Sequence, residues 1–289
     1  MSPPPFSDLG KQARDILTKG YHLGYMKYEF KCKGPEGVEL TSVCVHSQEQ
    51  CSMTGTIELK KKLKEYGLTL LGKWNTSNII TAEVANQDHI LQGLKLSADT
   101  CYSLSEGCKG SHVKGAYVHD HCALNGEFEC GKEDSSSLTA SAVLGISQGI
   151  LAGLQTKFNI QSSEMESYVI GGGYLMSDLI LSAFYHNGQK MNISCYHKTM
   201  PELEVGLDLG YSFESSEPRI ECGIKYALDG SSAVRTKVDF TNVNLNRIGL
   251  GYQQKIAQGV TFMVSAQLDV GGSEEGGGHK FGIAVELEA

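Results

Sequence analysis

From Tyr21 to the end of the chain, apolar and polar side chains alternate with a period of two. In 202–211, for example, apolar residues at odd positions are separated by Glu, Gly, Asp and Gly at even positions. The segments 219–226 and 260–270 repeat this pattern. Because successive side chains of a strand point to opposite faces of a sheet, the pattern predicts strands with one apolar and one polar face. We therefore expect an all-β fold.

Turn signals divide the alternating region into 19 expected strands. They lie at 21–32, 38–45, 53–60, 67–74, 78–84, 93–102, 111–118, 122–130, 137–144, 149–158, 168–174, 179–185, 190–197, 202–211, 219–226, 233–240, 247–253, 260–270 and 280–288. Dipeptides such as Asn187-Gly188 and Asp229-Gly230 are typical of tight hairpin turns. The chain has 34 Gly and only 6 Pro among 289 residues, which suits many strands joined by short turns. No linker interrupts 21–289, so this range is predicted to form one domain.

An amphipathic helix is expected over residues 7–19, within an N-terminal arm that spans 1–20. Its apolar residues recur at the spacing of one helix face, and its other face is charged. The apolar set is Leu9, Ala13, Ile16 and Leu17, and the charged set is Lys11, Arg14, Asp15 and Lys19. Ser7 or Asp8 is expected to cap the start, and Gly20 follows the end.

Two environments can satisfy strands of this kind: a soluble sandwich, whose polar face meets water, or a membrane barrel, whose apolar face meets lipid. No run of 18 apolar residues predicts a transmembrane helix, and the start lacks the apolar segment of a secretory signal. Nearly every expected strand has one apolar and one polar face, and no helical layer is expected that could cover the apolar face. Strands in lipid can leave no open edge, because unpaired backbone groups there have no water to bind. We therefore predict a closed transmembrane barrel whose first and last strands are parallel, because the strand count is odd.

Composition and motifs argue against several other functions. A net charge of −8 gives no support for nucleic-acid binding. The nine Cys form no CxxC pair, so we expect free thiols and no zinc ribbon. In an alternating segment His119 and His121 point away from Cys122, which argues against a metal site there. We find no nucleophile, base and acid in a recognisable arrangement, so we expect no catalysis, no metal and no cofactor.

Nine short runs span the chain and carry a resemblance. In chain order they are residues 8–15 (DLGKQARD), 18–21 (TKGY), 66–69 (YGLT), 73–76 (KWNT), 93–96 (GLKL), 142–145 (AVLG), 151–153 (LAG), 248–252 (IGLGY) and 277–280 (GGHK). Together they resemble the voltage-dependent anion channels, the porins of the mitochondrial outer membrane. Lys280, Gly282, Val285 and Leu287 also fit the sorting pattern of mitochondrial barrels. The odd strand count is consistent, since this family is the standard example of a 19-stranded barrel.

The resemblance implies a 19-stranded barrel with the N-terminal helix in the lumen. It implies a voltage-gated channel for passive diffusion of ATP, ADP, phosphate and chloride. It places Lys11, Arg14 and Lys19 at the constriction and Lys73 and Lys95 on the wall as residues that attract anions. It also implies that Ile248, Gly249, Leu250, Gly251 and Tyr252 form a nucleotide-contacting strand, with Gly20 and Gly24 as the hinge of the helix.

The chain departs from the family at two positions. Gly72 replaces a lipid-facing glutamate that many members have, and His22 replaces the middle of three spaced glycines. The resemblance implies hexokinase, apoptosis regulators and further copies of the chain as partners, but functions that need the glutamate should not carry over. A β-carbon at His22 narrows backbone freedom, so gating linked to the helix is expected to be altered.

Charges on the expected luminal face of the wall are nearly balanced. The cations are Lys27, Lys31, Lys60, Lys73, Lys95, Lys114, Arg219, Lys225, Arg235, Lys237, Arg247 and Lys280. The anions are Glu29, Glu39, Glu58, Glu83, Asp99, Glu127, Glu129, Glu204, Asp208, Glu221, Asp239, Asp269 and Glu286. The hypothesis is a pore with weaker anion preference than is typical of the family.

Two other functions remain open on the sequence. The first is the protein-conducting barrel of the outer-membrane import translocase, which shares the 19-strand plan. That barrel would need import partners and usually a longer polar N-terminal arm. The helix sequence and the run Lys73-Trp74-Asn75 favour the metabolite channel. The second is a soluble all-β binding protein, which alkaline carbonate would extract from membranes.

Overall fold

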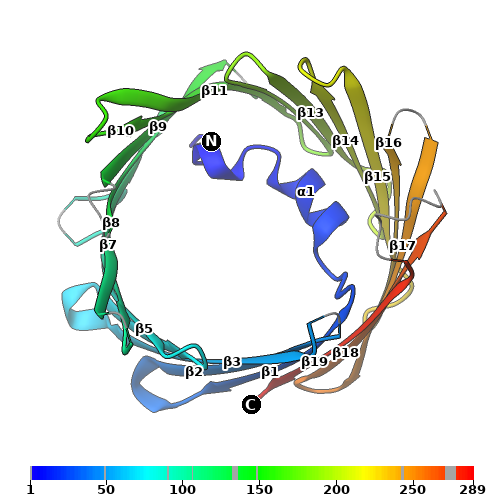
Figure 1. Cartoon of the computed structure of the whole chain (residues 1–289), viewed down its shortest axis with the longest axis horizontal. Coiled ribbons are helices and arrows are strands. Elements are labelled where there is room, and N and C mark those ends of the chain that lie inside the picture. The colour runs from blue at the N-terminus through cyan, green and yellow to red at the C-terminus, as the bar shows by residue number, and fades with distance from the viewer. Residues whose placement is uncertain are drawn as a thin grey trace.

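A computed structural model shows one closed sheet that surrounds an open lumen, with a short helix inside (Figure 1). The structure describes residues 2–48, 50–89, 91–105, 107–131, 136–147, 149–241, 244–270 and 278–289. None of the helices in these ranges has the length and apolar character needed to cross a membrane.

The described residues form 19 strands in chain order. They are β1 (Tyr25–Lys33), β2 (Val38–Ser47), β3 (Ser52–Leu63), β4 (Leu68–Asn75), β5 (Ile79–Gln87), β6 (Leu94–Ser103), β7 (Gly107–Val118), β8 (Cys122–Gly131), β9 (Ser136–Ser147), β10 (Ile150–Asn159), β11 (Glu164–Leu175), β12 (Leu179–His186), β13 (Lys190–Lys198), β14 (Leu203–Ser212), β15 (Glu217–Ala227), β16 (Ser232–Thr241), β17 (Asn244–Ala257), β18 (Val260–Asp269) and β19 (Lys280–Glu288). Short 3-10 turns lie at η1 (Phe6–Asp8), η2 (Pro35–Gly37) and η3 (Lys64–Tyr66), and the one α-helix among these elements is α1 (Lys11–Thr18).

Consecutive strands pair antiparallel around the whole ring, and the barrel closes where β1 meets β19. This seam is parallel and runs from Met26 opposite Ile283 to Lys31 opposite Glu288. An odd number of up-and-down strands requires such a closure. The predicted strand count, the parallel seam and the internal helix are therefore confirmed.

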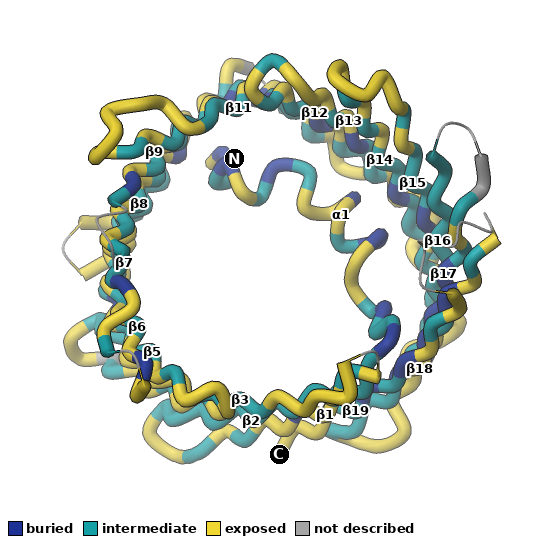
Figure 2. Tube along the Cα trace, viewed as in Figure 1, coloured by how far each residue is buried: buried dark blue, intermediate teal, exposed yellow. Residues whose placement is uncertain are grey.

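The outer face of the wall is apolar. Ile57, Trp74 and Ile80 are neighbours across β3, β4 and β5, and their exposed fractions are 45%, 43% and 39%. The alternation of exposed and partly buried residues along the strands is visible in Figure 2. In water so many exposed apolar side chains would be unfavourable, whereas lipid is their matching solvent.

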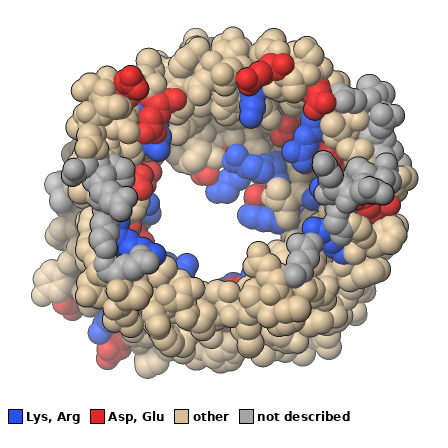
Figure 3. Space-filling view, in the orientation of Figure 1, with Lys and Arg blue, Asp and Glu red and all other residues tan. Residues whose placement is uncertain are grey.

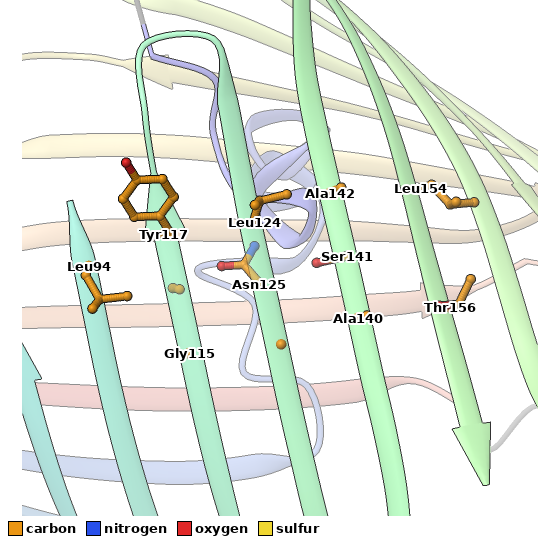
Figure 4. Close-up of a pocket in the computed structure, with 12 residues that line it drawn as sticks. Leu94, Gly115, Tyr117, Leu124, Asn125, Ala140, Ser141, Ala142, Leu154 and Thr156 are labelled. Carbon is orange, nitrogen blue, oxygen red and sulfur yellow. The ribbon is translucent and has the colours of Figure 1, made fainter. Parts of the chain in front are cut away.

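A groove of 420 Å³ lies where small residues replace large ones on β7 to β10. Gly115, Gly126 and Ala140 are aligned across these strands, and Leu124 and Leu154 rise beside them (Figure 4). Since glycine and alanine project little, the wall there is only slightly thicker than its backbone. The groove is part of the apolar surface that faces lipid.

The structure changes three expectations at the N-terminus. The expected helix over 7–19 is divided, because Gly10 adopts φ +67° and separates η1 from α1. Gly10 is also the N-cap, so neither Ser7 nor Asp8 caps α1 with its side chain. The first strand begins at Tyr25 and not at residue 21, because residues 19–24 form a connector between α1 and β1.

Candidate permeation pathway and its luminal helix

An open passage runs through the barrel beside α1. The space-filling view shows the opening and the Lys and Arg side chains on its inner wall (Figure 3). The strand register places charged residues of neighbouring strands side by side on this face: Glu204 lies opposite Lys225, and Asp208 opposite Glu221. The polar face of the alternating strands therefore lines a water-filled lumen, as the sequence predicts.

The floor beneath α1 is made of glycines on the luminal face of the wall. A β-carbon placed on Gly206 would lie 3.1 Å from the Ala13 carbonyl oxygen and 3.2 Å from the Ile16 β-carbon. One on Gly223 would lie 2.8 Å from a methyl carbon of Leu17. Ala13, Ile16 and Leu17 are accordingly almost completely buried. The missing side chains let the apolar face of the helix approach the backbone of β14 and β15.

Two basic side chains of β16 hold the C-terminal end of α1. Lys237 Nζ donates to the carbonyl oxygen of Leu17 at 3.0 Å, and Arg235 donates to that of Lys19 at 3.1 Å. Lys237 also lies over the ring of Tyr21, 4.7 Å from its centroid. The last carbonyls of a helix lack intrahelical partners and carry partial negative charge, so cations are favoured there.

The N-terminal end of the arm is anchored by apolar contacts. Phe6 and Leu9 belong to a buried cluster with Ala123, Val143 and Leu151 of the wall. Phe6 also packs edge-on against Phe184, with ring centroids 5.8 Å apart. The helix is thus fixed at both ends and lies along one side of the lumen (Figure 1).

The three predicted helix cations face the lumen, but each has a partner. Lys11 Nζ is 2.9 Å from Asp8 Oδ1, and Lys19 Nζ is 2.7 Å from Asp15 Oδ2. The hydrogen bond to Asp8 raises the pKa of Lys11 above its ordinary value. Arg14 donates to the Ser7 carbonyl oxygen at 2.8 Å. The helix therefore adds less net positive charge to the passage than three free cations would.

Arg14 also lines a luminal cavity of 330 Å³ beneath η1 and α1. Asp208, Asn192 and His186 contribute polar groups to the same cavity. A permeating ion would therefore meet both signs of charge beside the helix.

Lys73 and Lys95 project from the wall on the luminal face. Lys73 lies opposite Glu58 on β3, and Lys95 lines a second cavity of 310 Å³ with Ser7 and Lys114. Among the residues that the structure describes, neither Lys73 nor Lys95 forms an ion pair. These two ammonium groups are consequently the predicted cations best able to attract a passing anion.

The predicted nucleotide-contacting strand lies within β17 and divides between the two faces. Gly249 and Gly251 face inward, where a β-carbon would meet Lys237 and the Gly20 carbonyl oxygen respectively. Leu250 and Tyr252 are 43% and 38% exposed on the outer side, and Ile248 shares their face by alternation. Of the five residues 248–252, Gly249 and Gly251 are therefore the two turned toward the lumen, and the connector covers Gly251.

The connector has the two predicted hinge residues at its ends. Gly20 and Gly24 have φ values of +82° and +81°, a region that favours glycine. Between them Tyr21 is buried against the wall, and burial raises its pKa to about 12 against the opposing effect of Arg235. His22 donates its backbone N–H to Ser265 Oγ at 2.8 Å. The connector is therefore ordered by contacts with the wall between two permissive residues.

Ion pairs along the wall neutralise much of its charge. Glu29 is held between Lys27 and Lys31, at 2.5 and 2.6 Å. Lys225 pairs with Glu204 at 2.8 Å. Each such pair places opposite charges side by side on the luminal face, where the sequence count expects cations and anions in nearly equal number.

Sequence reasoning missed several residues that shape the pathway. It treated Arg235 and Lys237 only as wall charges, although both hold the helix, and it overlooked the floor glycines. It also omitted the luminal pair Lys157–Glu166, whose Nζ and Oε2 are 2.9 Å apart. The available signal was glycine at luminal positions of consecutive strands. The described residues contain no group of three or more His, Cys, Asp or Glu that could hold a metal ion.

An apolar outer face, a charged open lumen and an internal helix together define a transmembrane β-barrel channel. A model of the eukaryotic porin family matches residues 2–282, and the chain belongs to that family.

Full-length relatives carry channel names. The chain is 40% identical over 289 residues to the voltage-dependent anion-selective channel of Drosophila melanogaster, covering 100% of both chains. It is 36% identical over 287 residues to the non-selective voltage-gated ion channel VDAC2 of Xenopus laevis, covering 99% of each. A triple mutant of Rhodopseudomonas blastica porin aligns with a TM-score of 0.51 at 12% identity, over 76% of this chain and 90% of that one, a likeness of fold alone.

Proposed function

We propose that the chain forms a voltage-gated channel of the mitochondrial outer membrane, through which small metabolites and ions diffuse passively. The permeants are adenine nucleotides, phosphate and chloride. The observation that carries this proposal is the open, charge-lined lumen of a barrel whose full-length relatives are named as voltage-gated channels. The same comparisons favour a metabolite channel over the protein-conducting barrel of an import translocase.

Passage through such a pore needs weak attraction at several points, so that an anion enters and leaves again. Lys73 and Lys95 supply unpaired positive charge on one part of the wall. The helix cations Lys11 and Lys19 are offset by Asp8 and Asp15. The proposed result is a pore with a weak preference for anions, between the anion-selective and non-selective descriptions of the relatives.

Reconstitution into a planar bilayer tests this function. In a salt gradient we expect a single-pore conductance that falls at high voltage of either sign, and a reversal potential close to zero. Failure to form pores would contradict the channel function, whereas a strongly anion-selective reversal potential would contradict only the proposed charge balance. Co-purification of the native barrel with translocase subunits would favour the alternative function.

Partners of the channel are a separate part of the proposal. Gly72 lies on the lipid face of β4, opposite Leu59 and Ala82, and a β-carbon there would meet nothing within 4 Å. We infer that partner contacts that need a carboxylate at this position, with hexokinase among them, are absent. Gly72→Glu should fold, because the position is open, and should gain any hexokinase binding that depends on the carboxylate. Equal binding by both proteins in a vesicle pull-down would contradict this.

A further inference from the structure

The connector crosses the luminal face of β18 and β19 just before the chain enters β1. Gly24 donates its N–H to the carbonyl oxygen of Phe281 at 3.0 Å, and the His22 N–H is bound by Ser265. A β-carbon on Gly282 would fall on the carbonyl group of His22, so glycine is needed there for the connector to approach. The connector thus covers the inner side of the strands next to the barrel seam.

The ring of His22 is enclosed without polar partners. Both ring nitrogens are buried, and neither has a hydrogen-bond partner among the described residues. The ring packs edge-on against Tyr25, with centroids 5.6 Å apart. Burial lowers the pKa of His22 below its ordinary value of 6.5, Lys27 lowers it further, and Glu29 opposes them. This enclosure suits a neutral imidazole and disfavours an imidazolium.

Charges around the ring offer little compensation for a proton. The titratable groups on the luminal faces packed near the connector are Lys27, Glu29 and Lys31 on β1, Lys280 and Glu286 on β19, Arg235 and Lys237 on β16, and the phenol of Tyr21. From β18, the neighbours Ser265 and Gln267 are neutral. Glu29 is already bound by Lys27 and Lys31. A protonated His22 would therefore meet a carboxylate that two lysines have already neutralised.

We propose that His22 is a proton-sensitive latch: the neutral ring holds the connector against β18 and β19, and protonation releases the connector. The glycines at both ends of the connector, each with positive φ, allow it to move as a unit. The latch requires a titratable ring between Gly20 and Gly24, and His22 provides it in this chain.

The direction of the pH effect follows from linkage. The docked state binds a proton less tightly than the released state, in which His22 is hydrated and titrates near 6.5. Release is therefore favoured as pH falls below that value and is suppressed above it. If the docked ring takes up no proton, the ratio of released to docked connector rises by at most roughly 30-fold between pH 8 and pH 5.

Nuclear magnetic resonance of the full chain in detergent micelles tests the latch without any need for conductance. We expect the His22 ring to titrate below 6.5, the ordinary pKa of histidine, and the amides of His22 and Gly24 to shift from bound to free positions between pH 8 and pH 5. In His22→Leu, whose buried side chain cannot titrate, these amides should stay in the bound position throughout. His119→Gln is the matched control and should behave like the unmodified chain.

Conductance in planar bilayers is the second test of the latch, and it rests on the proposed channel function. Closures of the unmodified pore and of His119→Gln should become more frequent as pH falls from 8 to 5, and those of His22→Leu should not. An unshifted connector in the unmodified chain at pH 5 overturns the latch, as does equal pH dependence in His22→Leu. Absence of pores would count against the channel function alone, because the resonance experiment still decides the latch.

Discussion

Lys237→Met tests whether β16 holds the helix in place. The substitution removes the donor to the Leu17 carbonyl and the cation over the Tyr21 ring. A hydrogen bond from a charged group contributes about 1.5 kcal/mol at the lower end of its range, and a partly exposed cation–π contact about 0.5 kcal/mol. The sum of about 2 kcal/mol corresponds to a roughly 30-fold increase in the fraction of released helix.

Amide hydrogen exchange of α1 in micelles measures that fraction. An eight-residue helix is only marginally stable in water, so release from the wall should unfold α1 and expose its amides. The Lys19 amide, which donates to the Asp15 carbonyl at 3.0 Å, should exchange roughly 30-fold faster in Lys237→Met.

Lys225→Met is the matched control for this experiment. It also removes one luminal cation, but its partner is Glu204 of the wall and not the helix. Lys237→Arg should restore protection, since a guanidinium can also donate to the helix carbonyls. Equal exchange in Lys237→Met and Lys225→Met would refute the assignment of Lys237 as a helix anchor.

Further substitutions test the floor, the wall and the N-terminal anchor. Gly223→Val should displace the helix at a cost of about 1–3 kcal/mol, because its β-carbon would lie 2.8 Å from Leu17. Exchange of the α1 amides should then become faster. In the control Gly210→Val, the nearest atom to the β-carbon would be 3.6 Å away, so exchange should be unchanged. Lys95→Glu should move the reversal potential toward cation selectivity. Lys61→Glu is its control and should not, because Lys61 lies opposite Val38 on the outer face of β3. Phe6→Ala should cost about 3 kcal/mol of anchoring and raise the mobility of a spin label at Ser2, and an unchanged label spectrum would contradict that anchor.

The strands were predictable because a two-residue period is a local property. The alternation within each segment separates its apolar side chains from its polar ones. In a barrel in lipid, this alone assigns the apolar set to the outer face and the polar set to the lumen. The ends were less accurate: β17 runs from Asn244 to Ala257, although only 247–253 was expected. Pairing with long neighbouring strands extends a ladder beyond the residues that alternate clearly.

Contacts of the helix could not be read from the sequence in the same way. Lys237 and Leu17 are separated by 220 positions, and their spacing carries no periodic signal. Gly10 was also misjudged, since glycine within an apolar helical pattern can either be tolerated or break the helix. Here it takes a positive φ and divides the expected helix.

The parallel seam has a consequence for how the finished barrel can be made. The chain enters the ring at β1, next to the strand that completes it, and residues 2–24 lie inside. The ring therefore becomes a continuous enclosure only when the last nine-residue strand pairs with the first. Once the barrel is closed, the N-terminal arm can leave the lumen only through one of its two openings and not sideways into the bilayer. The order of two assembly steps, entry of the arm and pairing of β1 with β19, therefore determines whether a newly assembled barrel contains its helix.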